Sequence, residues 1–194
     1  MPTELLKPVE TMLRKFKIPL VPRLIRRRRR GKTFGDDQSG VTAVEFALIA
    51  PPFFALLLAL FEVGLVFFSG SVLENAVNDA ARLIRTGQAQ QGNFSKSAFA
   101  SAVCSKLAMF DCGKLVVDVE TFQNFSSVGI SEPLDADGNL KTNFPFNMGV
   151  GGDVVLVRVF YEWKLIAPKL SLMTNMGTGN RLLSTAQVFR NEPF

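Results

Sequence analysis

The stretch that decides the fold is VTAVEFALIAPPFFALLLALFEVGLVFFSG, residues 41–70. Its only charged residues are Glu45 and Glu62, and its apolar residues would lie on every side of a helix. Residues 46–68 in helical conformation would measure about 34 Å, enough to cross a bilayer core of roughly 30 Å. A core helix of a soluble domain is the alternative, but such a helix carries polar residues on one face. The stretch therefore predicts a transmembrane helix over 41–70.

The charges of the chain are divided at Gly40. The whole sequence of 194 residues carries a net charge of +5. Residues 1–40 hold eleven Lys/Arg against four Asp/Glu, whereas the remainder holds eleven against thirteen. Because Lys and Arg beside a span mark its cytoplasmic side, we expect 1–40 to be a basic cytoplasmic arm and 71–194 to be periplasmic. Nucleic acid is not expected as a partner, since the folded part is not basic.

Residues 71–194 predict an α+β domain. Apolar residues at helical spacing continue over 71–86, so we expect the membrane helix to extend outward and to stop near Gly87. A second helix is expected from Ser95 to about Met109. Three segments with alternating apolar residues predict strands at 114–122, 153–165 and 181–190. The simplest packing is an antiparallel sheet of about three strands covered by helices.

Cys104 and Cys112 are the only cysteines, and both lie on the predicted outer side. In an oxidising compartment such a pair is expected to form a disulfide; two buried free thiols are the alternative. The sequence contains no histidine, which excludes Ser-His triads, histidine metal sites and imidazole acid–base chemistry. We therefore expect no catalytic residue, no metal and no cofactor, and a membrane-anchored enzyme is the least favoured class of function.

Two groups of acidic residues in the outer domain are not expected to form sites. Asp135, Asp137 and Asn139 resemble part of a calcium loop, but the closing Glu at position twelve is missing, so a polar turn is expected. Asp118 and Glu120 lie on the strand face opposite the apolar residues, and we expect both to be solvated.

The membrane helix is entered through Ser39-Gly40-Val41-Thr42-Ala43-Val44-Glu45-Phe46. Glu45 is costly in an apolar helix, although its place one turn from the edge reduces the cost. If the chain were cut after Gly40, Val41 would gain an α-amine with a pKa of about 7.7–8.0. That amine could pair with Glu45 of the same or a neighbouring chain and set the axial register of packed helices. Alternatively, Gly40 is only a linker residue and Glu45 reaches the interface without a partner.

Three other residues interrupt the apolar stretch. Glu62 lies near the outer edge, and it either reaches the outer water or bonds to a neighbouring helix. Pro51 and Pro52 free backbone groups and predict a kink of the helix. This kink is either a harmless bend or a melted segment that aids extraction from the bilayer.

At these residues the sequence resembles a type IV prepilin processing site, and specifically the TadE-like family of tight-adherence (Flp) pilus assembly proteins. The resemblance is strongest over residues 39–88. The motifs that carry it are Gly40 with Glu45-Phe46, Pro51-Pro52, Phe61-Glu62-Val63-Gly64 and Leu73-Glu74-Asn75-Ala76.

The resemblance implies a bacterial inner-membrane protein cut between Gly40 and Val41 by a prepilin peptidase. It implies a minor pilin or pseudopilin that helps to assemble the pilus, with pilus subunits, inner-membrane pilus or secretion machinery and membrane lipid as partners. The leader is long for a prepilin, and Phe46 stands where major Flp pilins typically have Tyr. An uncleaved single-pass scaffold of a secretion or pilus machine is therefore the alternative.

Overall fold

The computed structural model describes residues 40–194. The basic arm predicted over 1–40, apart from Gly40 itself, lies outside the described residues.

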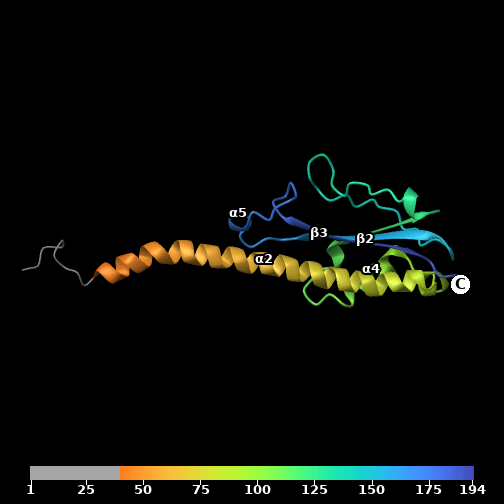
Figure 1. Ribbon diagram of the computed structural model, residues 1–194, viewed down its shortest axis with the longest axis horizontal. Coiled ribbons are helices and arrows are strands. Elements are labelled where there is room, and N and C mark those ends of the chain that lie inside the picture. The colour runs from red at the N-terminus through yellow and green to blue at the C-terminus, as the bar shows by residue number, and fades with distance from the viewer. Residues whose placement is uncertain (1–39) are drawn as a thin grey trace, which may run out of the picture. The chain divides into compact units, whose positions relative to one another are not determined.

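The long helix α2 runs from Val41 to Arg85 without interruption (Figure 1). It confirms that the predicted membrane helix continues into the α+β domain, and it passes through Pro51 and Pro52. The helix ends where Gly87 adopts a left-handed conformation (φ 77°), which a residue without a Cβ adopts most easily. The amide of Gly87 donates to the carbonyl of Ile84, so one of the last free helix carbonyls is satisfied.

The predicted three-stranded antiparallel sheet is confirmed. Its strands are β1 (Leu115–Phe122), β2 (Val154–Trp163) and β3 (Arg181–Arg190), in the order β1-β2-β3. The register places Val159 of β2 between Val117 of β1 and Thr185 of β3. The boundaries differ from the predicted ones by at most two residues, which is the usual spread at strand ends.

Shorter helical segments lie between α2 and the strands in the sequence and in the loops that join the strands. They are α3 (Gln88–Gln91), α4 (Lys96–Cys104), α5 (Pro168–Ser171) and the 3₁₀ turns Cys112–Lys114 and Phe125–Ser127. The Ser95 hydroxyl accepts a hydrogen bond from the amide of Ala98 and so caps α4. The expectation that this helix reaches Met109 is wrong, because the chain turns after Cys104 and brings Leu107 and Phe110 into the core.

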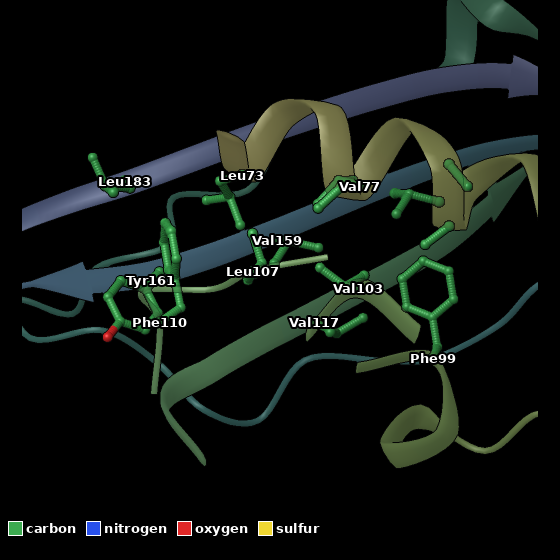
Figure 2. Packing of buried hydrophobic residues seen from close by; sticks show 14 of the residues in the cluster. Leu73, Val77, Phe99, Val103, Leu107, Phe110, Val117, Val159, Tyr161 and Leu183 are labelled. Atoms are coloured by element: carbon green, nitrogen blue, oxygen red, sulfur yellow. The ribbon is translucent and has the colours of Figure 1, made fainter. Parts of the chain in front are cut away.

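The main core lies between the helices and one face of the sheet (Figure 2). Leu73 and Val77 of α2 and Phe99 of α4 pack there against Val117 and Val159 of the strands. Among the described residues, loop segments rather than helices cover the opposite sheet face. A smaller cluster there contains Phe160, Met176 and Leu182, with Leu134, Leu140 and Phe144 packed against it from the loop between β1 and β2.

Cys104 and Cys112 form a disulfide that joins the end of α4 to the turn before β1. The bridge spans eight residues of sequence, and the chain-entropy relation gives such a short loop about 2–3 kcal/mol. We expect the double variant Cys104→Ala/Cys112→Ala to lose about that much unfolding free energy. The measurement is urea unfolding of the variant and of the oxidised wild-type chain in detergent, with reduced wild-type chain as the control, and equal stabilities of variant and oxidised wild type would contradict the expectation.

Candidate functional site: the membrane helix and its junction with the domain

The predicted processing residues lie at the start of α2. Gly40 immediately precedes the helix, Val41 is its first residue, and Glu45 follows one turn later. Gly40 and Glu45 are exposed, and Phe46 is 68% exposed. Neither Glu45 nor Phe46 is covered by the folded domain, so both remain available to lipid or to another helix.

The apolar first half of α2 is largely uncovered by the folded domain. The large apolar residues exposed between 41 and 61 are Val41, Val44, Phe46, Leu48, Ile49, Phe53, Phe54, Leu56, Leu57, Leu58, Leu60 and Phe61. A helix of that length measures about 31 Å, close to the thickness of a bilayer core. Within the described residues α2 is the one helix long and apolar enough to cross a membrane.

The domain begins to cover α2 at Glu62. One face of the helix is buried from there on, including Glu62, Val66 and Ser69. All three lie inside the stretch 41–70 that hydropathy assigns to the membrane. Hydropathy does not distinguish burial against a domain from burial in lipid, because both environments favour apolar residues. The helix is therefore uncovered on all sides only over 41–61, and beyond Glu62 its other face still exposes Phe67 and Phe68.

Glu62 forms the junction between the helix and the domain. Its side chain is 3% exposed, and its Oε1 accepts hydrogen bonds from the backbone amides of Ile166 and Ala167. The Ala167 bond measures 2.9 Å. Neither sequence-based alternative for Glu62, outer water or a neighbouring helix, anticipated this contact with the chain's own domain. Its other oxygen, Oε2, has no hydrogen-bond partner among residues 40–194.

The expectation that Asp118 is solvated is wrong. Asp118 is fully buried, and its Oδ2 lies 2.8 Å from Nε and 2.5 Å from Nη2 of Arg158. Arg158 is only 2% exposed, and its guanidinium carbon lies 5.9 and 5.4 Å from the ring centroids of Phe144 and Phe160. Its other donors reach the backbone carbonyl and hydroxyl of Ser131, at 2.6 and 2.7 Å. The buried pair therefore attaches the long loop between β1 and β2 to the sheet.

The loop from 164 to 180 is attached at its far end by Glu162. The side-chain amide of Asn180 and the hydroxyl of Thr178 donate to Glu162 Oε1 at 2.7 and 2.8 Å. The bond from Asn180, followed by that from Thr178, lowers the pKa of the Glu162 carboxyl. Glu162 thus stays ionised at neutral pH, and from its place in β2 it binds the far end of the loop, at Thr178 and Asn180.

The acidic loop at Asp135 is a polar turn, as expected. Its Oδ1 accepts from the amides of Asp137 and Asn139 at 3.0 and 2.8 Å, and Gly138 has a positive φ of 77°. No group of three or more His, Cys, Asp or Glu side chains between residues 40 and 194 is placed to hold a metal ion.

The stretch that contains the exposed start of α2 and the Glu62 junction also resembles a protein family. Residues 40–82 match the family model of TadE-like protein. The match confirms the resemblance over the segment that contains Gly40, Glu45 and Glu62, and it suggests involvement in tight-adherence pilus assembly. Searches of curated proteins and of solved structures give no match.

The folded domain contains two features that the sequence did not predict. The Asp118–Arg158 pair and the Glu62 junction both depend on contacts between residues far apart in the chain. A signal for the first was present: Arg158 interrupts the apolar run VVLVRVF of β2. A charge inside such a run is buried only when it is paired.

Proposed function

We propose that this protein is a minor pilin or pseudopilin-like subunit that takes part in assembly of a tight-adherence (Flp) pilus. The role is structural, not enzymatic. The observation that carries the proposal is the match of residues 40–82 to the TadE-like model, in a helix whose apolar half the domain leaves exposed. A helix of this kind can lie in the bilayer before assembly and pack against other pilin helices afterwards.

In the proposed mechanism a prepilin peptidase cuts between Gly40 and Val41 at the bacterial inner membrane. The basic arm holds the N-terminus on the cytoplasmic side until then, and the α+β domain folds in the periplasm. Cleavage removes the arm and creates an α-amine at Val41. The carboxylate of Glu45, on the same or a neighbouring chain, then neutralises this amine in an environment of low dielectric, where such a pair interacts strongly. The partners are pilus subunits and inner-membrane pilus machinery.

The first experiment is N-terminal sequencing of the protein extracted from the cell envelope. We expect the mature chain to begin at Val41. An intact Met1 would exclude the processed-pilin mechanism and favour the uncleaved scaffold.

The second experiment tests the carboxylate. We expect Glu45→Ala to abolish or severely reduce pilus formation, measured by electron microscopy of surface filaments and by surface adherence. Removing one partner of a charge pair in a low-dielectric environment leaves the other charge uncompensated. Asp79→Ala is the matched control, because Asp79 is an exposed carboxylate on the same helix, beyond the apolar half and outside the motifs that carry the resemblance. Normal pilus formation by Glu45→Ala would contradict the pairing and support the scaffold alternative.

A further inference from the structure

We propose that residues 164–173 form a membrane-contact segment, which seats the outer domain on the lipid leaflet from which α2 emerges. The segment reads KLIAPKLSLM and contains α5. Its partner is the bilayer surface, with anionic phospholipid headgroups and the adjacent acyl chains. The proposal needs α2 to cross a bilayer, but it does not depend on the role in pilus assembly.

The segment exposes three large apolar side chains. Ile166 is 75% exposed, Leu170 48% and Leu172 82%, whereas the neighbouring Leu165 is 6% exposed and packs in the main core. The buried Leu165 therefore fixes the segment to the domain while the three others face outward. Exposed apolar groups gathered in one short segment are typical of a contact surface for membrane or protein.

The position of the segment beside α2 favours a membrane, rather than a protein, as its partner. Glu62 accepts hydrogen bonds from the amides of Ile166 and Ala167, so these residues lie level with the point where the domain begins to cover the helix. Figure 1 shows α5 at the end of the domain nearer to the apolar first half of α2. Since residues 41–61 span about 31 Å as a helix, a bilayer around them would place its surface at this level.

The positive charges of the segment also favour an anionic lipid surface as the partner. Lys164 and Lys169 are both exposed, and no acidic residue occurs between them or as far as Met173. The carboxylates closest in sequence and contact are already engaged: Glu162 by Asn180 and Thr178, and Glu62 by the segment's own amides. Two exposed lysines beside exposed aliphatic side chains are a combination that binds anionic headgroups and inserts into the interface.

The test uses the full chain with an environment-sensitive fluorophore (NBD) on a single added cysteine. The variants are Leu172→Cys and Ile166→Cys, with Val150→Cys as the matched control. Val150 is 67% exposed and precedes β2, whereas the membrane-contact segment follows β2, so the two label sites lie at opposite ends of that strand. Wild-type chain without an added cysteine, treated with the same fluorophore, shows how much label the native disulfide takes up. Each protein is placed, one chain per disc, in nanodiscs of phosphatidylethanolamine and phosphatidylglycerol.

We expect labels at 166 and 172 to be blue-shifted, quenched by nitroxide attached near the lipid headgroups, and several-fold less accessible to iodide than the label at 150. Replacing Lys164 and Lys169 with Glu should raise the iodide accessibility of the label at 172. Equal iodide accessibility at 172 and 150 would overturn the proposal. Protection that occurs only when several chains share a disc would also overturn it, because a second copy of the chain would then be the partner. The experiment contains no pilus component, so its failure leaves the proposed function untouched.

Discussion

The variant Arg158→Met is expected to lose about 3–5 kcal/mol of unfolding free energy, the usual cost of leaving a buried charge without its partner. Asp118 is fully buried, and its Oδ2 receives both of the bonds that Arg158 makes to it. Glu120, at 3.5 Å from Arg158 Nη2, would lose the same partner. Ser131 would also be released, so the loop between β1 and β2 should become more sensitive to protease.

The measurement is urea unfolding of the full chain in mild detergent, with circular dichroism as the signal that monitors unfolding. Arg190→Met is the matched control, because Arg190 is an exposed arginine on the adjacent strand β3. The double variant Asp118→Leu/Arg158→Met should regain most of the lost stability, since a buried ion pair replaced by apolar groups of similar volume is often neutral. A single variant as stable as wild type, or a double variant less stable than the single one, would show that the pair is not the cause.

The variant Glu62→Leu is expected to release the membrane-contact segment from the helix. Two backbone amides, those of Ile166 and Ala167, would lose their acceptor, and each buried unpaired group costs about 1–3 kcal/mol. Hydrogen exchange of these two amides, measured by NMR or mass spectrometry in detergent, should become faster, while the amides of β2 stay protected.

Glu62→Gln is the matched control for this result. Its carbonyl oxygen can accept the same two hydrogen bonds, and its amide group would occupy the place of Oε2, which already has no partner among the described residues. We therefore expect Gln to preserve most of the protection that Leu removes. Equal loss in both variants would mean that the charge, rather than the acceptor, holds the segment.

Local pattern was sufficient for the elements of regular structure. The alternation of Val155, Val157 and Val159 identified the face of β2 that joins the main core, although the other face is buried too. The apolar spacing after residue 71 predicted the outward extension of α2. The end of α4 was missed, because a disulfide and two core side chains after Cys104 outweigh the local helical pattern. Local propensity is a weak prior wherever such tertiary contacts compete with it.

In the candidate site, too, the sequence predicted some features and missed others. Gly40, Glu45 and Glu62 are visible in the sequence because each is an exception next to or within an apolar run. The partner of Glu62 was not visible, since it consists of backbone amides about a hundred residues later in the chain. Every residue except proline has a backbone amide, so residue type does not show which amides a carboxylate binds.

By itself, the sequence determined that a long apolar helix follows a basic arm and leads into a small α+β domain. Those properties depend on the order of apolar and charged residues along the chain, and hydrophobic periodicity expresses that order directly. Only the tertiary structure decided where the domain begins to cover the helix, that Asp118 is buried with Arg158, and that Glu62 holds the membrane-contact segment. These contacts arise when distant segments are brought together, and their energies depend on burial and distance, which no single stretch of sequence contains.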